Sequence, residues 1–107
     1  MKIVVLCGGL STERNISFLS GAKVCKALRD NGHAAVLVDL FMGLENAPAE
    51  IQAKPELLFE NLPELHARTF DGAQVDLEQV KASRKLQDGS VFGQGVLDIC
   101  KKADIVF

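Results

Sequence analysis

A chain of 107 residues has the size of one typical domain, so we expect a single folded domain over residues 1–107. Hydrophobic residues make up 48% of the chain and charged residues 24%, which excludes the composition of a disordered protein. The formal net charge is only -2, so the charge predicts neither nucleic acid nor a membrane surface as a partner.

Residues 3–7 are apolar and rich in β-branched side chains, and Gly8 and Gly9 stop the run. This pattern is typical of a strand that is buried on both faces of a parallel sheet. A second unbroken apolar run predicts another strand over residues 33–40.

Between these strands, residues 11–29 carry apolar side chains at helical spacing. Ser11 or Thr12 is the predicted N-cap, and Gly32 is the predicted stop after the helix. Strand, helix and strand form one βαβ unit. Its first loop is expected at the carboxyl end of the first strand, where open α/β sheets bind ligands.

The pattern weakens between Gly43 and Gly89, and how this stretch folds stays open. Residues 73–77 fit either a short strand or the start of a helix that continues through Lys85. Prolines interrupt the stretch at three positions: Pro48, Pro55 and Pro63.

Regular structure is predicted again at the end of the chain. Residues 93–102 fit a helix with Val96, Leu97 and Cys100 on one face, and the apolar residues 103–107 predict a third buried strand. The predicted fold class is therefore α/β, with an open, mainly parallel, Rossmann-like sheet and flanking helices. Because no loop follows this strand, we expect the chain to be a truncated part of a longer protein.

The cysteines Cys7, Cys25 and Cys100 lie far apart and form no C-x-x-C pair. This spacing predicts neither a disulfide framework nor a zinc site, so we interpret them as small buried residues with free thiols. Free thiols are typical of a reducing compartment, and the first apolar residues are too few for a signal peptide. These features predict a cytoplasmic protein.

The segment from Gly8 to Arg14 leads from a strand into a helix, and such a segment can hold an anion with its backbone N–H groups. However, it matches neither the G-x-G-x-x-G pattern nor the phosphate-binding P-loop, because it lacks a third glycine in register and a lysine. The residues alone therefore favour a tight turn at Gly8 and Gly9 over an anion site.

Four further polar residues could have either a structural or a functional role. Glu13 fits a first-turn acid that interacts with the helix dipole, but at the ligand-facing edge of a sheet it also fits a carboxylate that binds a substrate ammonium. Asp39 ends the second strand and is interpreted as a turn residue, since the dinucleotide glycine pattern is missing. His33 and His66 lack partners at metal-ligand spacing and are interpreted as surface or turn residues.

The amino-terminal sequence nevertheless resembles one family. Residues 2–17, KIVVLCGGLSTERNIS, followed by Ser20, Gly21 and Ala22, carry a G-G-x-S-x-E-R-x-x-S pattern that resembles the start of D-alanine:D-alanine ligases. Residues 27–28, 31–33 and 38–39 are similar to the family's next helix and strand, and residues 103–107 are similar to the strand before its His-Gly loop. The resemblance leaves out the stretch between Gly43 and Gly89.

The resemblance implies the domain that precedes an ATP-grasp module in a ligase. Such an enzyme activates one D-alanine with ATP and Mg²⁺ and joins it to a second D-alanine, which provides a precursor of peptidoglycan. It further implies that Glu13 binds the ammonium of the first D-alanine, that Ser17 also takes part in substrate binding, and that Gly8, Gly9 and Ser11 shape the loop.

No residues here match the family's His-Gly loop, ATP-binding lysines or magnesium ligands. We therefore expect the chain to have no turnover alone and to bind neither ATP nor Mg²⁺ tightly, with those sites in the remaining ATP-grasp domains. Family members are commonly homodimers, which makes a homodimer possible. Two alternatives stay open: the front domain of another ATP-grasp ligase, and a non-catalytic module that binds a nucleotide or anion.

Overall fold

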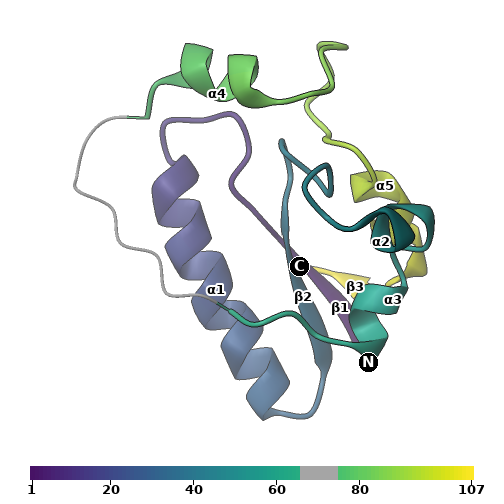
Figure 1. The fold of residues 1–107 in the computed structure, drawn as a ribbon. Coiled ribbons are helices and arrows are strands. Elements are labelled where there is room, and N and C mark those ends of the chain that lie inside the picture. Colours follow the sequence, from purple (N-terminus) through teal and green to yellow (C-terminus); the bar gives the residue numbers. More distant parts are fainter. Residues whose placement is uncertain (66–74) are drawn as a thin grey trace.

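The computed structural model describes residues 1–65 and 75–107 and shows an open sheet of parallel strands (Figure 1). The strands β1 (Lys2–Cys7), β2 (Ala34–Asp39) and β3 (Ile105–Val106) lie in the order β2-β1-β3, with β1 in the centre. The predicted α/β class with a parallel, Rossmann-like sheet is thus confirmed.

The first βαβ unit forms where the apolar runs predict it. β1 and β2 pair in parallel register from Lys2 beside Ala34 to Cys7 beside Asp39, so both strands end at the same edge of the sheet. The helix α1 (Arg14–Asp30) connects them and packs on one face. The core on this face consists of Ile3, Val5, Cys25 and Ala35.

The predicted N-cap of this helix is wrong. Glu13 is the N-cap residue of α1, and its side chain makes no capping hydrogen bond. Ser11 instead accepts a hydrogen bond from the backbone N–H of Glu13 at 2.9 Å, which tightens the turn before the helix. A turn of this kind competes with capping, so a serine before a helix was not sufficient to locate its start. Asn31 is the C-cap residue and Gly32 follows it with a positive φ of 87°, as the predicted stop requires.

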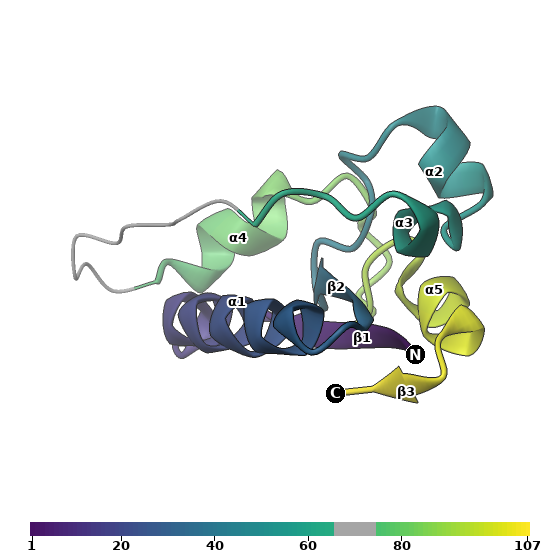
Figure 2. The same ribbon diagram turned by 90° about the horizontal axis from the view of Figure 1, so that it is seen from below.

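Helices α3 (Leu57–Glu60) and α5 (Val96–Lys102) lie on the opposite side of the sheet from α1, which Figures 1 and 2 show from two directions. The core on this side is built from residues of both strands and both helices: Val4, Val36, Val38, Phe59, Val96 and Ile99. Two cores on two faces make the layered arrangement that covers a parallel sheet.

The end of the chain differs from two predictions. Leu97 is 53% exposed, and the residues of α5 that reach the core are Val96 and Ile99, with Cys100 packed against it. The predicted buried third strand pairs with β1, but Ile105 and Val106 are 43% and 45% exposed. The reason is its place at the sheet edge, because the described part of the chain leaves much of this strand uncovered.

The stretch between Gly43 and Gly89 contains the short helices α2 (Ala49–Ala53), α3 and α4 (Leu77–Ser83). Of the two possibilities for the region near residue 75, the helix is the one observed, with Asp76 as its N-cap and an end at Ser83 rather than Lys85. His66 and residues 73 and 74 lie outside the described residues.

Two buried polar side chains hold this stretch near the sheet edge. The guanidinium of Arg84 lies 3.8 Å from the ring centre of Phe41 and donates to the carbonyl oxygens of Phe41 and Leu86. The carboxylate of Glu45 accepts a hydrogen bond from the backbone N–H of Lys85 at 2.8 Å. The bonds from Arg84 to Phe41 and from Lys85 to Glu45 join residues 43 and 40 positions apart, so no local sequence pattern predicts them.

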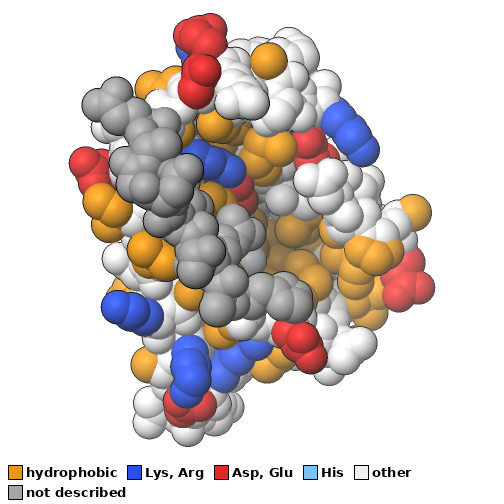
Figure 3. All heavy atoms as spheres, turned by 60° about the vertical axis from the view of Figure 1, so that its left-hand side comes forward, with side chains coloured by type: hydrophobic (Ala, Val, Ile, Leu, Met, Phe, Trp, Pro, Cys, Tyr) orange, Lys and Arg blue, Asp and Glu red, His pale blue; other side chains and the backbone are white. Residues whose placement is uncertain are grey.

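On the face shown in Figure 3, basic and acidic side chains are interspersed with hydrophobic ones rather than gathered by sign. Among the described residues, no helix has the length and apolar character needed to cross a membrane.

Candidate functional site

The loop that follows β1 is a tight turn with two left-handed glycines. Gly8 and Gly9 have φ values of 71° and 81°, a region that side-chain-bearing residues rarely adopt, so the predicted turn is present. The N–H of Gly8 donates to the hydroxyl oxygen of Ser17 at 3.0 Å, and the N–H of Gly9 points to Oδ1 of Asp39 at 3.5 Å. Since both donors have partners within the chain, the glycines do not form an open anion cradle.

Arg14 organises this loop, a role that the sequence analysis missed. Its Nη1 donates to the carbonyl oxygen of Gly9 at 2.9 Å and to Oδ1 of Asp39 at 3.0 Å, and its Nη2 donates to Oδ2 of Asp39. The guanidinium also lies 4.9 Å from the ring centre of Phe18, one turn further along α1. Arg14 was visible in the G-G-x-S-x-E-R pattern, but its partner is 25 positions away and could not be found by spacing.

Asp39, which was interpreted as a turn residue, is the last residue of β2 and the counter-ion of Arg14. Its Oδ1 accepts hydrogen bonds from the backbone N–H groups of Phe41 and Met42 at 3.0 and 3.2 Å. The side chains of Arg14 and Asp39 are 12% and 14% exposed, so the ion pair is largely shielded from water. Asp39 thereby joins the ends of two neighbouring strands.

Glu13 lies beside this ion pair in sequence and differs from it in environment. The residue is exposed, and no hydrogen bond or ion pair of its carboxylate is found within residues 1–65 and 75–107. Ser11 is also exposed, whereas Ser17 is partly buried and uses its hydroxyl oxygen as the acceptor for Gly8. The structure thus places Glu13, Ser11 and Ser17 around one turn at the carboxyl end of β1.

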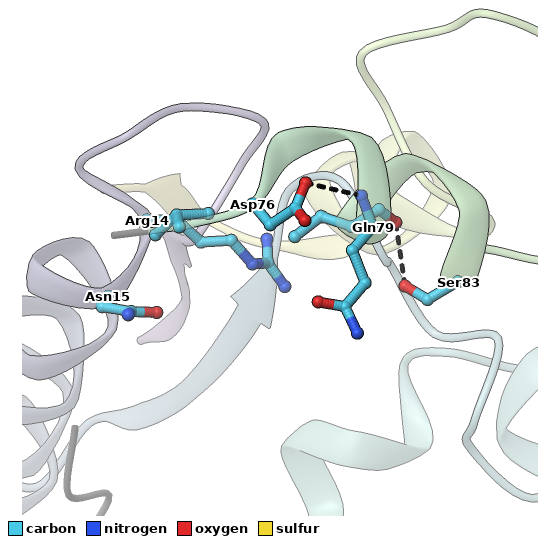
Figure 4. Close-up of a pocket in the computed structure, with 7 residues that line it drawn as sticks. Arg14, Asn15, Asp76, Gln79 and Ser83 are labelled. Carbon is cyan, nitrogen blue, oxygen red and sulfur yellow. Dashed lines mark hydrogen bonds between the residues drawn. The ribbon is translucent and has the colours of Figure 1, made fainter. Parts of the chain in front are cut away.

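A pocket of about 320 Å³ lies between the start of α1 and helix α4, beside this turn (Figure 4). Arg14 and Asn15 face it from one side, and Asp76, Gln79 and Ser83 face it from the other. Sequence reasoning did not identify Asn15 or the α4 residues, because about 60 positions separate them in the chain. Neither Glu13 nor Ser17 lines this pocket.

Burial makes two of the three thiols less reactive. Burial raises the pKa of the Cys25 thiol above its ordinary value, although nearby Arg29 opposes the change, and burial also raises the pKa of Cys100. A raised pKa keeps a thiol protonated and weakly nucleophilic at neutral pH. Cys7 and Cys25 are buried as predicted, while Cys100 is only partly buried.

No cluster of three or more His, Cys, Asp or Glu side chains suited to a metal ion occurs in the part of the chain that the structure describes. These residues therefore offer no set of ligands that fits Mg²⁺, and no chemical step is assigned to a metal held by them.

Comparison with known proteins identifies relatives along the whole chain. It is 38% identical to the D-alanine–D-alanine ligase of Lacticaseibacillus casei strain BL23 over 107 residues, which are 100% of this chain and 29% of that protein. It is 40% identical to the D-alanine–D-alanine ligase of Pediococcus pentosaceus over 109 residues, which cover 100% of this chain and 30% of that protein. The ligase of Aquifex aeolicus is 46% identical over 59 residues, which are 55% of this chain and 20% of that protein.

No protein-family model and no solved structure matches the chain. The chain spans 29–30% of the length of the curated relatives that it matches in full, and the match falls on their amino-terminal part. It also includes the stretch between Gly43 and Gly89, which the sequence resemblance had left out. The resemblance is thereby confirmed, and the chain corresponds over its whole length to the amino-terminal region of D-alanine–D-alanine ligases.

Proposed function

We propose that this chain is the substrate-side domain of an ATP-dependent ligase that joins two D-alanines, and that it contributes to the first D-alanine site. Two findings support this proposal: the full-length match to ligases that carry this name, and the position of Glu13 at the edge of the sheet. The product of such an enzyme is a precursor of peptidoglycan, and the expected compartment is the cytoplasm.

The observation that carries the proposal is the exposed carboxylate of Glu13, which has no partner among the described residues, beside a turn held by hydrogen bonds. The neighbouring donors and acceptors are engaged within the chain: Gly8 with Ser17, and Arg14 with Asp39. Among the residues that the structure describes, Glu13 offers an exposed carboxylate at this turn. A carboxylate binds an ammonium group through charge-assisted hydrogen bonds, which are stronger than neutral ones.

Ser17 is proposed to support the same site from the first turn of α1. Its oxygen accepts the N–H of Gly8, and a hydroxyl that accepts one hydrogen bond still has its own proton to donate. Gly8 and Gly9 are proposed to shape the turn by their positive φ values, and Ser11 by accepting the hydrogen bond from the Glu13 N–H.

Phosphoryl transfer is assigned to the remaining ATP-grasp domains of the complete ligase. When bound there, ATP supplies the phosphoryl group that activates a D-alanine carboxylate, and Mg²⁺ offsets the phosphate charge. This chain by itself is expected to release no phosphate in the presence of ATP and D-alanine. If the purified 107-residue chain releases phosphate in a D-alanine-dependent way, the assignment of phosphoryl transfer to the remaining domains is wrong.

A Glu13→Gln substitution in the complete ligase tests the central assignment. The amide keeps the size of the side chain and removes the charge, so the KM for the first D-alanine should rise about tenfold or more, with a smaller change in kcat. Glu50→Gln is the matched control, because Glu50 is an exposed acid in the first turn of α2. Unchanged kinetics for Glu13→Gln refute the assignment.

The two alternatives predict different results. A different ATP-grasp ligase with this front domain would activate another acid and would show no dependence on D-alanine. A non-catalytic module would bind a nucleotide tightly through the glycine turn, but the N–H groups of Gly8 and Gly9 have partners within the chain. Because these two donors already have acceptors within the chain, the ligase is the favoured alternative.

A further inference from the structure

We infer that Asp39 is a positioning residue that holds the guanidinium of Arg14 away from Glu13 and so keeps the Glu13 carboxylate available for an ammonium group. The inference rests on the proposed function, because it concerns the same carboxylate. It adds a second acid, from a different strand, that is not expected to touch the substrate.

The sequence places a possible competitor for the Glu13 carboxylate directly beside it. Glu13 is followed directly by Arg14, and a guanidinium presents five N–H donors that match a carboxylate well. Arg14 is also the basic residue nearest to Glu13 in the chain. Consecutive residues at the start of a helix do not face each other, but a guanidinium without a partner on so long a side chain would still compete through its charge for the anion that the ammonium needs.

Asp39 keeps the guanidinium of Arg14 occupied. Both oxygens of Asp39 accept hydrogen bonds from Arg14, and Oδ1 is itself fixed by the N–H groups of Phe41 and Met42. The carbonyl oxygen of Gly9 takes a further bond from Arg14 Nη1 at 2.9 Å. These contacts direct the guanidinium towards the end of β2, where it is 12% exposed.

The ion pair of Arg14 and Asp39 packs closely against the backbone at Gly8. A Cβ atom on Gly8 would lie 2.7 Å from Oδ1 of Asp39 and 3.0 Å from both Nη1 of Arg14 and the ring of Phe18. Glycine at this position thus lets the backbone pass directly over the ion pair. With Arg14 neutralised below the turn, Glu13 remains exposed and without a partner among the described residues.

The test uses the complete ligase without ATP and measures D-alanine binding by isothermal titration calorimetry. Asp39→Asn keeps the shape of the side chain and removes its charge, which frees Arg14 to pair with Glu13. We expect affinity for D-alanine to fall about threefold to tenfold. Asp30→Asn is the matched control, because Asp30 forms an exposed ion pair with Lys26 on α1, the helix that carries Arg14.

The double variant Arg14→Gln with Asp39→Asn separates charge from structure. It removes the competitor together with its counter-ion, so D-alanine affinity should return to within about threefold of the unsubstituted ligase. A structural role for the pair predicts the opposite, since the double variant loses more bonds than the single one. A double variant that binds as weakly as Asp39→Asn overturns the inference. The same comparison remains decisive if Asp39→Asn alone does not fold, because a tenfold loss in the folded double variant also overturns it.

Two outcomes distinguish this inference from the proposed function. In a Glu13→Gln background, Asp39→Asn should produce no further loss of affinity, because the carboxylate that Arg14 would capture is gone. If Glu13→Gln weakens binding but Asp39→Asn does not, only the inference fails. If Glu13→Gln has no effect, the proposed function fails, and any effect of Asp39→Asn then acts by a route other than Glu13 and overturns the inference as well.

Discussion

Among the described residues, Arg14 and Arg84 each stack on a phenylalanine ring near the carboxyl edge of the sheet, and they are neutralised in different ways. Arg14 lies over Phe18 and forms a shielded ion pair in which Asp39 is 14% exposed. Arg84 lies over Phe41, but its nearest acid, Asp88, is 3.5 Å away and 49% exposed. The close bonds of Arg84 run to the carbonyl oxygens of Phe41 and Leu86 instead.

This difference shows two ways to satisfy a buried cation. The positive charge of Arg84 is stabilised by two backbone carbonyl oxygens and by the face of the Phe41 ring. These contacts join two loops without a second buried charge on the partner side. At Arg14 a full counter-charge is used, next to an exposed acid whose carboxylate must stay free in the proposed site. We therefore expect the Arg84 cluster, made of Arg84, Phe41 and Leu86, to matter for stability, and the Arg14 pair to matter for binding.

The largest effect is expected at Gly93, where the backbone passes close to the backbone of Phe41 in the Arg84 cluster. A Cβ atom on Gly93 would meet the carbonyl oxygen of Phe41 and backbone atoms of Met42 and Gly43, and backbone cannot move aside as a side chain can. Gly93→Ala should lower the free energy of unfolding by about 3 kcal/mol or more, measured by urea denaturation. Gly89→Ala is the control, because space is open there and only the positive φ of 75° costs about 1 kcal/mol. Equal losses in both variants would show that the crossing near Gly93 is not tightly packed.

A somewhat smaller effect is expected from the Arg84 side chain itself. Arg84→Met keeps much of the apolar contact with Phe41 but leaves two carbonyl oxygens without their donor, and it should cost about 2–4 kcal/mol. Lys26→Met removes an exposed ion pair on α1 and should cost about 0.5 kcal/mol or less. If thermal and urea unfolding show similar losses for the two variants, burial of Arg84 does not stabilise the fold.

The smallest effect is the one that compares the two clusters directly. A double-mutant cycle between Arg14 and Asp39 should yield a coupling free energy of about 1–3 kcal/mol, because the pair is shielded and makes two hydrogen bonds. The same cycle between Arg84 and Asp88 should yield about 0.5 kcal/mol or less, since Asp88 is half exposed. Coupling of equal size would remove the distinction between charge and dipole neutralisation.

The sequence-based predictions succeeded where the signal is local. The apolar runs at residues 3–7 and 33–40 located β1 and β2, and helical spacing located α1, because burial of a strand or a helix face leaves a periodic pattern. The turn at Gly8 and Gly9 was predicted for the same reason, since a left-handed backbone demands a residue without a side chain.

Predictions failed where exposure or partners depend on distant residues. The strand at residues 105–106 is apolar enough to be buried, yet its position at the edge leaves it exposed. Leu97 fits the predicted face of α5, but α5 meets the sheet through Val96 and Ile99. The pocket beside Arg14 is formed together with α4. Because α4 is far from α1 in the sequence, no local pattern predicts that the two lie side by side.

The sequence by itself determined the βαβ unit, the glycine turn and, through its resemblance to a family, the choice of Glu13 as the residue to test. Only the tertiary structure decided that Arg14 belongs with Asp39 rather than with the adjacent Glu13. The reason is geometric: parallel pairing brings Cys7 beside Asp39, so an acid that is 25 positions away in sequence lies under the turn. Hydrogen bonds then favour that distant acid over the neighbouring one, because Asp39 is already held in place by the backbone.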